Sequence, residues 1–372
     1  MEQSFSDISL YHEYRSARET EHLVSQKTWD DLNLDDFFEW ADRTSSCVGR
    51  QYLYDVLHYN RLSEIPEQEE VIRKLSADKE LRAEIRSELW KHFFTEIVNV
   101  FFLREVIPVS KAFFLLQGRQ EQIEEVFRYF GLVDVLCSVS ELRDGLPYYV
   151  LPEACSEGET FHAEGLYHPL IERCIPNDIT LCGKSVLVAG SNMSGKTTFI
   201  RAIGLNLLSA QVLHTCFARS FRFPMDTALY SAIHLEDSLM EGKSFFLQEV
   251  QIVREMLEAG KECWRFFLLD ELFKGTNTVE RIAIAKAVLS ALAHKNSIVF
   301  ASTHDVELAS LLEDEYELFH FCECVADNTL SFDYKLKPGP VTERNAIRII
   351  EMCGYPQEVV REAYRLSEED VL

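Results

Sequence analysis

The spacing of apolar residues divides the chain into two parts. Over residues 34–140, apolar side chains recur three and four positions apart, as in residues 48–57, which is typical of helices that bury one face. Residues 64–90 are charged and amphipathic, and no sustained heptads indicate a coiled coil. Short apolar pieces broken by Pro and Gly follow over residues 138–165 and predict strands and loops. We therefore expect the first part to be mostly helical.

In the second part, strand-like runs alternate with helical ones. Apolar runs over residues 184–190, 264–270 and 297–302 predict strands, and segments that end near Cys216 and His294 predict helices between them. Strands interleaved with helices imply a mostly parallel sheet with helices on its faces. The expected organisation is an N-terminal extension over residues 1–34, a helical domain over residues 35–140 and an α/β domain over residues 141–372.

A glycine-rich loop follows the first of these predicted strands. Residues 190–197 are Gly-Ser-Asn-Met-Ser-Gly-Lys-Thr, which fits the G-x-x-x-x-G-K-S/T pattern of a phosphate-binding loop, and a predicted helix comes next. Small residues let the backbone N–H groups and the helix N-terminus face an anion. Lys196 would then reach the β- and γ-phosphates, and the Thr197 hydroxyl would bind Mg²⁺. The alternative is an ordinary glycine-rich turn, which the strand–loop–helix context disfavours.

Two carboxylates and a histidine follow the next two predicted strands. Asp270 is suited to hold Mg²⁺, and Glu271 to orient or deprotonate an attacking water, whereas helix capping is the alternative for one of these acids. His304 comes where a residue that senses the γ-phosphate would have to lie, although a single histidine is more often structural. The loops that contain Ser244 and Asn277 have, on their own, only helix-capping potential.

Composition limits the partners and the compartment. The 372 residues include 37 basic and 61 acidic side chains, a formal net charge of −24. This balance disfavours a broad non-specific grip on nucleic acid, which needs clustered Lys and Arg. Charges and Pro108 break the apolar stretch over residues 93–117, so we expect a buried helix there and no membrane partner. With no visible signal peptide, and ten cysteines but no C-x-x-C pair, a reduced cytoplasmic protein is expected.

The order of these motifs resembles the ATPase domain of the MutS mismatch-repair family, which is of the ABC ATPase class. The matching segments are residues 168–179, 190–198, 269–278, 302–308 and 349–360. The resemblance implies a P-loop ATPase domain that binds ATP and Mg²⁺. Residues 38–53 and 132–136 resemble more faintly the start and the resumption of the family's helical core domain. Too few residues separate them for the family's DNA clamp, which we expect to be absent.

The resemblance also assigns roles to residues. The expected nucleotide-binding residues are Gly190, Ser191, Asn192, Met193, Ser194, Gly195, Lys196, Thr197, Thr198 and Ser244. Thr197 and Asp270 would hold Mg²⁺, and Glu271, His304 and Asn192 would serve hydrolysis, with Asn192 positioning the water. In the family, two ATPase domains associate head to tail around the nucleotide, so Ser244 and the Asn277 loop would come from the partner subunit. Ile175 and Ile179 are candidates either for adenine contact or for the core.

Several residues depart from the family pattern. Ser191 and Ser194 replace the usual Pro and Gly of the phosphate loop, and Phe245 replaces the Thr of the signature Ser-Thr pair. Phe273 and Arg281 stand where Gly is usual. A phosphate loop can tolerate the first two changes, and Ser244 keeps the hydroxyl expected to contact the γ-phosphate. We expect Phe273 and Arg281 to reshape the loop that faces the partner subunit and to leave the Mg²⁺-binding and water-handling groups in place.

Two functions fit these observations. The first is a MutS-family ATPase that serves DNA mismatch repair or DNA-structure surveillance as a homodimer switched by ATP. The second is a nucleotide-gated interaction protein that has lost DNA binding and acts on a protein partner, such as a repair protein. The net charge of −24 and the missing clamp favour the second, and family membership favours the first. An ABC transporter subunit is disfavoured because the Leu-Ser-Gly-Gly-Gln signature is absent.

Overall fold

The computed structural model describes most of the chain, in two compact units. The described residues are 8–19, 24–59, 65–88, 120–191, 193–233, 245–259, 263–294, 296–326, 329–341 and 346–368. Residues 93–117, for which we expected a buried helix, lie outside this set, as do Asn192 and Ser244. One unit comprises Met1–Pro152 and Asn206–Phe217, and the other comprises Glu153–Leu205 and Ala218–Leu372. Among the described helices, none is both long enough and apolar enough to cross a bilayer.

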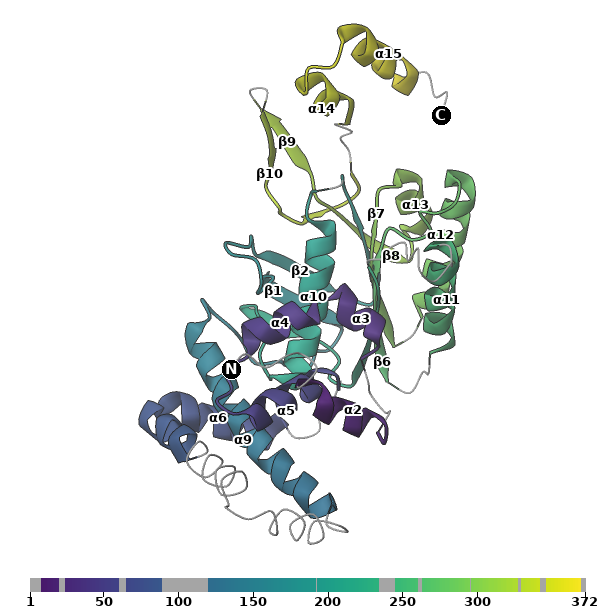
Figure 1. Cartoon of the computed structure of the whole chain (residues 1–372). Helices are drawn as coiled ribbons and strands as arrows, with labels where there is room; N and C mark the ends of the chain where they lie inside the picture. Colours follow the sequence, from purple (N-terminus) through teal and green to yellow (C-terminus); the bar gives the residue numbers. More distant parts are fainter. Residues whose placement is uncertain are drawn as a thin grey trace, which may run out of the picture. The chain divides into compact units, whose positions relative to one another are not determined.

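The first unit is built mainly from helices, coloured purple to blue in Figure 1. They are α2 (Leu10–Ser16), α3 (Gln26–Asp31), α4 (Leu34–Ala41), α5 (Cys47–Leu57), α6 (Ile65–Ala77) and α9 (Gln120–Gly145). Helices α5 and α9 contact each other closely because residue 49 is glycine: a Cβ at Gly49 would lie 2.2 Å from Asp134 Oδ2. The buried Asp134 carboxylate accepts hydrogen bonds from the backbone N–H groups of Ser45 and Ser46. One carboxylate of α9 therefore satisfies the backbone where α5 begins.

The second unit is organised around a parallel-rich sheet. Its six described strands lie in the order β11 (Lys337–Pro338), β8 (Tyr316–His320), β3 (Ser185–Ala189), β7 (Ser297–Thr303), β6 (Trp264–Asp270) and β5 (Thr227–Ala232). All neighbouring pairs are parallel except β11 with β8. The predicted strands over residues 184–190, 264–270 and 297–302 are therefore present as β3, β6 and β7. The expectation of a mixed α/β structure with a mostly parallel sheet is confirmed.

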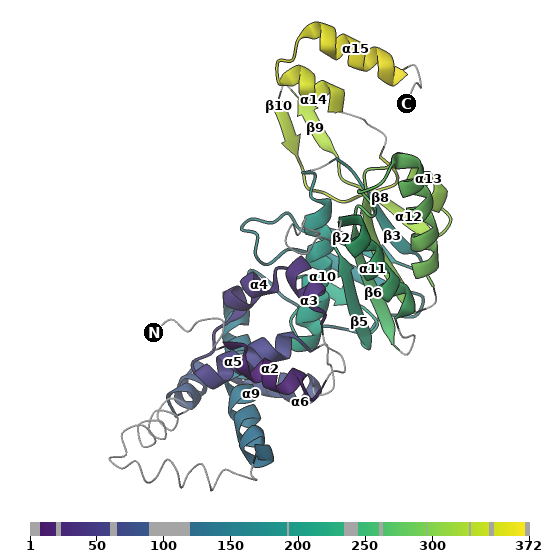
Figure 2. The same ribbon diagram turned by 45° about the vertical axis from the view of Figure 1, so that its right-hand side comes forward.

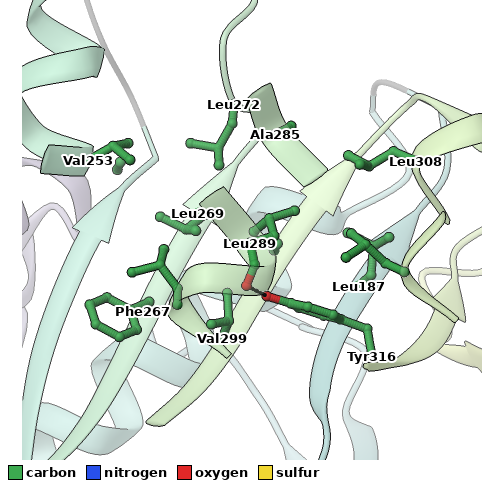
Figure 3. Packing of buried hydrophobic residues seen from close by; sticks show 14 of the residues in the cluster. Leu187, Val253, Phe267, Leu269, Leu272, Ala285, Leu289, Val299, Leu308 and Tyr316 are labelled. Atoms are coloured by element: carbon green, nitrogen blue, oxygen red, sulfur yellow. Dashed lines mark hydrogen bonds between the residues drawn. The ribbon is translucent and has the colours of Figure 1, made fainter. Parts of the chain in front are cut away.

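Helices cover both faces of this sheet. Helices α11 (Phe245–Glu258), α12 (Thr278–Leu292) and α13 (Val306–Leu312) lie along one face, and α10 (Lys196–Val212) lies on the other (Figures 1 and 2). The core under α11, α12 and α13 is apolar, and within it the buried Tyr316 hydroxyl donates a 2.8 Å hydrogen bond to Leu289 O (Figure 3). Such a bond satisfies a hydroxyl that burial would otherwise leave unpaired.

Smaller elements complete the second unit. A three-stranded antiparallel sheet has the order β2 (Asn177–Leu181), β1 (Phe161–Leu166) and β4 (Ser220–Arg222). The ring of Phe161 in β1 meets Phe266 and Phe300 of the large sheet edge-on. The chain ends with the hairpin of β9 (Glu323–Ala326) and β10 (Thr329–Phe332), followed by α14 (Ala346–Met352) and α15 (Gln357–Glu368).

Candidate functional site

The pairing of three strands gathers the predicted site residues at one edge of the sheet. Strand β7 lies between β3 and β6, and all three are parallel, so their carboxyl ends meet. Ala189 is in register with Thr303, and Asp270 is in register with Ser302. The phosphate loop, the two carboxylates and the histidine segment therefore emerge side by side. This is the edge where ligands bind in sheets of this kind.

The phosphate loop curls around the side chain of Lys196. The Nζ atom donates hydrogen bonds of 2.7 Å to Gly190 O and 2.8 Å to Ser191 O. Gly190 has φ +148° and, with a Cβ, would approach Phe321 O to 2.6 Å, so glycine is required at this position. Helix α10 begins at Lys196, which places a helix N-terminus at the loop.

The departures from the family pattern in this loop have structural roles of their own. The Ser194 hydroxyl donates a 2.8 Å hydrogen bond to Ser191 O. The Ser191 hydroxyl donates a 2.8 Å bond to the buried Glu323 Oε2 on β9, a contact that a proline could not make. Met193 has φ +74° and projects into solvent, with 81% of its surface exposed. The loop is therefore tied to β9 on one side and exposes an apolar side chain on the other.

A hydroxyl and a carboxylate meet where Mg²⁺ is expected. Thr197 Oγ1 donates a 2.7 Å hydrogen bond to Asp270 Oδ2, and the Ser302 hydroxyl donates to Asp270 Oδ1. No cluster of three or more His, Cys, Asp or Glu side chains in the described ranges could hold a metal ion. Mg²⁺ suits this place nevertheless, because it is commonly held by one or two carboxylates together with substrate phosphates and water. The oxygen donors present fit that ion.

Glu271 lies at the centre of a cluster of cationic groups. Its Oε2 is 3.4 Å from His304 Nδ1 and forms an ion pair with Lys274, and its Oε1 is 3.6 Å from Lys196 Nζ. The hydrogen bond from His304, with those cations and against the effect of burial, lowers the pKa of Glu271 to about 2. The same hydrogen bond raises the pKa of His304 above its ordinary value. Glu271 is therefore ionised and fully engaged in this conformation.

A cavity of about 670 Å³ opens beside these groups, within the range of small-molecule sites. Its wall includes Ser191, Met193, Gly195, Lys196, Thr197, Thr198, Asp270, Glu271 and Lys274. Further lining residues come from the segment 166–177, where burial lowers the pKa of His168 to about 4. Ile175 lines the cavity, whereas Ile179 is buried in β2 and does not.

Some residues of the site could not be recognised from sequence. Phe321 and Tyr334 line the cavity although they follow strands remote from the phosphate loop in sequence, and no motif marks them. Lys274 forms an ion pair with Glu271 in the turn after β6, where the i,i+3 rule for helices does not apply, so its spacing gave no signal. Asn277, expected to face a partner, caps α12 by accepting a 3.0 Å hydrogen bond from Glu280 N. The roles expected for Asn192 and Ser244 fall outside the described residues and stay predictions.

A buried glutamate also contacts the loop after the carboxylates. Glu249 of α11 accepts a 2.7 Å hydrogen bond on Oε1 from the backbone N–H of Phe273. Its Oε2 has no hydrogen-bond partner among the described residues, and burial raises the pKa of this carboxyl. Phe273 has φ +62°, the left-handed conformation for which glycine is favoured, and its side chain is buried. Glycine, the residue that the family resemblance leads us to expect at this position, would adopt this backbone conformation without strain.

A family model and several known proteins that resemble this chain all point to the same family. The fold defines a mixed α/β protein with a parallel-rich sheet, and the model of MutS domain V matches residues 186–369. The DNA mismatch repair protein MutS of Thermus thermophilus is 32% identical over 251 residues, which is 66% of this chain and 30% of the relative. MutS of Thermotoga petrophila is 27% identical over 313 residues, covering 82% and 37%, and that of Lactobacillus acidophilus is 29% identical over 258 residues, covering 66% and 30%.

This chain belongs to the MutS family, as its motifs predicted. It spans about 30% of the length of the Thermus relative it matches.

Proposed function

We propose that this protein binds ATP with Mg²⁺ and hydrolyses it in a P-loop, ABC-class ATPase domain. The observation that carries the proposal is the convergence of Lys196, the Thr197–Asp270 pair and the Glu271–His304 pair at one sheet edge beside a cavity. Residues 141–372 are proposed as this ATPase domain. Residues 35–140 are proposed as a shortened, clamp-less core domain, preceded by an extension over residues 1–34.

Binding of the triphosphate requires a change of partners for Lys196. Its ammonium group donates to two carbonyls of its own loop, and phosphate oxygens would replace them as stronger, charge-assisted acceptors. The loop N–H groups and the N-terminus of α10 would face the same anion. Thr197 and Asp270 would hold Mg²⁺, which when bound offsets phosphate charge and orients the γ-phosphate.

Hydrolysis would proceed by in-line attack of water on the γ-phosphorus, with Glu271 placing the water. A carboxylate with a pKa of about 2 is a weak base, so in the observed conformation Glu271 is better suited to orient water than to accept its proton. Phosphate oxygens would compete with Glu271 for Lys196 and Lys274, and release of those cations would make the carboxylate more basic. His304 would remain beside Glu271 as a sensor of the γ-phosphate.

From the resemblance to the MutS family we propose a head-to-tail dimer of ATPase domains. Met193 on the phosphate loop is 81% exposed, and Val279 in the first turn of α12 is 79% exposed. Exposed apolar side chains mark an interface only where they form a contiguous patch, so these two residues are candidates for contact with a second subunit and do not by themselves establish one. A second ATPase domain would bury them while supplying Ser244 and the Asn277 loop. ATP would then act as the switch that joins the two subunits.

For the biological role, we propose mismatch repair or DNA-structure surveillance, because the relatives carry the name of a DNA mismatch repair protein. The alternative, a nucleotide-gated switch for a protein partner without DNA binding, is favoured by the net charge of −24. A salt titration of DNA binding separates the two. Phosphate contacts make affinity fall steeply with salt, and a flat slope or no binding would contradict the DNA role.

Phosphate release from Mg-ATP tests the ATPase proposal. Glu271→Gln should still bind ATP but hydrolyse it at least about 10²-fold more slowly, because a neutral amide cannot accept a proton from the attacking water or hold it as a carboxylate does. Arg254→Gln is a matched control, since Arg254 is exposed on α11 and pairs with Glu258. Hydrolysis by Glu271→Gln at the wild-type rate, or failure of the wild type to bind ATP, would contradict the proposal.

A further inference from the structure

Arg281 forms a two-pronged ion pair with the residue after His304. Arg281 lies in the first turns of α12, and its Nε and Nη2 atoms donate hydrogen bonds of 3.0 and 2.7 Å to the two carboxylate oxygens of Asp305. The side chains are only 14% and 9% exposed. A planar guanidinium that meets both oxygens fixes the orientation of the carboxylate as well as its position. The pair therefore restrains the segment that carries His304.

The Asp305 side chain binds Arg281 and does not cap its own helix, α13. It is the N-cap residue of α13, a position where aspartate normally accepts a hydrogen bond from the helix backbone. Here its side chain makes no capping hydrogen bond, and its own N–H donates to Thr303 Oγ1 at 3.0 Å. The carboxylate is committed to Arg281 instead, so the contact is not a by-product of helix capping.

The restraint continues to the catalytic centre through His304. Its Nε2 lies 3.8 Å from Asp305 Oδ1, and its Nδ1 lies 3.4 Å from Glu271 Oε2. The imidazole is 44% exposed, so packing alone does not hold it in place. When His304 is protonated, Arg281, Asp305, His304 and Glu271 thus form a chain of ion pairs of alternating charge from α12 to the glutamate.

We propose that Arg281 is a positioning residue that acts through Asp305 to hold His304 against Glu271. The inference rests on the ATP hydrolysis proposed above. Asn277 caps the same helix, α12, and its loop is proposed to face the nucleotide of the partner subunit. The Arg281–Asp305 pair therefore connects that loop to His304 of the same chain.

The steady-state kinetics of ATP hydrolysis test this role. Arg281→Gly should lower kcat about tenfold through misplacement of His304, with KM for ATP changed less than about twofold because the phosphate loop is untouched. Arg281→Lys should recover part of the loss, since it keeps the charge without the fork. The Arg281→Gly/Asp305→Asn double variant should be no slower than the slower single variant. An unchanged kcat for Arg281→Gly, or additive losses in the double variant, would overturn the proposal.

A measurement without nucleotide separates this inference from the proposed function. In NMR spectra of the full chain, the His304 imidazole is assigned with His304→Gln, and Arg254→Gln serves as the control. The groups that face His304 are Glu271 and Asp305, with Arg281 behind Asp305 and Lys196 and Lys274 on Glu271. If Arg281 positions the ring, Arg281→Gly weakens the Glu271 contact and the pKa of His304 falls towards its ordinary value.

If Arg281 acted on His304 only through its charge, Arg281→Gly would raise the pKa of His304, because a neighbouring cation would be lost. A rise or no change would therefore overturn the proposal, even in a folded and active variant. Should the wild type fail to hydrolyse ATP while the pKa falls as expected, the restraint stands and the proposed function fails.

Discussion

Phe273 combines two features with opposite effects on the free energy of unfolding. Its backbone is left-handed, with φ +62°, which costs a non-glycine residue about 1–2 kcal/mol. Its side chain is 2% exposed and lies in the core beside the ring of Phe246, at a centroid distance of 6.2 Å. Phe273→Gly introduces the residue that is usual in the family. It would remove the backbone strain of the positive φ and would also remove the buried side chain.

The magnitudes decide which effect dominates. Truncating a buried phenylalanine costs about 3–5 kcal/mol. The greater freedom of glycine in the unfolded chain adds about 0.5–1 kcal/mol. After relief of the backbone, Phe273→Gly should therefore destabilise the second unit by about 2–4 kcal/mol. Phe273→Ala loses the same contacts and keeps the strained backbone, so it should be less stable than Phe273→Gly by about 1 kcal/mol.

Native-state hydrogen exchange measures the effect in the right part of the chain. Slowly exchanging amides of the central strands, such as those of Phe267 in β6 and Val299 in β7, report the free energy of opening this unit. The expected order of stability is wild type, then Phe273→Gly, then Phe273→Ala. A glycine variant as stable as the wild type would refute the dominance of burial. An alanine variant more stable than the glycine variant would show that the positive φ costs less than the added freedom of glycine in the unfolded chain.

Three further predictions concern the site and its core. The pKa of His304 is raised by its contact with Glu271, whose own pKa is about 2. The loss of unfolding free energy in His304→Gln, measured in urea titrations at several pH values, should therefore be largest between about pH 4.5 and 6.5 and should vanish as pH rises through the raised pKa. The contribution of the ionised Glu271 carboxylate to the free energy of unfolding should be lost only as pH falls from about 4.5 towards 2. Tyr316→Phe should lower the free energy of opening measured by hydrogen exchange by about 1 kcal/mol, because it removes the hydrogen bond to Leu289 O. An unchanged free energy of opening would contradict a stabilising role for this buried bond. Lys196→Ala should weaken ATP binding in calorimetry about tenfold or more, and equal affinity would argue against a phosphate-binding role.

Sequence reasoning predicted the local structure where its determinants are contiguous, whereas the nucleotide-binding roles of the site residues stay predictions. The phosphate loop is a contiguous run between an apolar strand and a helix, and its glycines mark backbone that other residues adopt poorly, as the +148° φ of Gly190 illustrates. The order of the strands with Asp270 and His304 at their ends also sufficed to expect one site, because parallel strands share an edge.

Contacts between distant segments could not be predicted in the same way. Nothing in the sequence pairs Ser191 with Glu323, or Arg281 with Asp305, because these contacts depend on strand register and on the packing of helices. No sequence pattern indicated that Arg281 pairs with the carboxylate beside His304, and its expected effect on a loop facing the partner stays a prediction. Side-chain pairing of this kind depends on tertiary geometry, which local periodicity does not contain.

The measurement that tests the central claim most directly is the mass of Glu271→Gln in solution, by light scattering, with and without Mg-ATP. An ATP-driven switch predicts a species of twice the 43.0 kDa chain mass when ATP is bound, and the single-chain mass when it is absent. A matched titration confirms that ATP is bound in the same sample. A 43.0 kDa species with ATP demonstrably bound would contradict the switch and leave a nucleotide-binding domain that works alone.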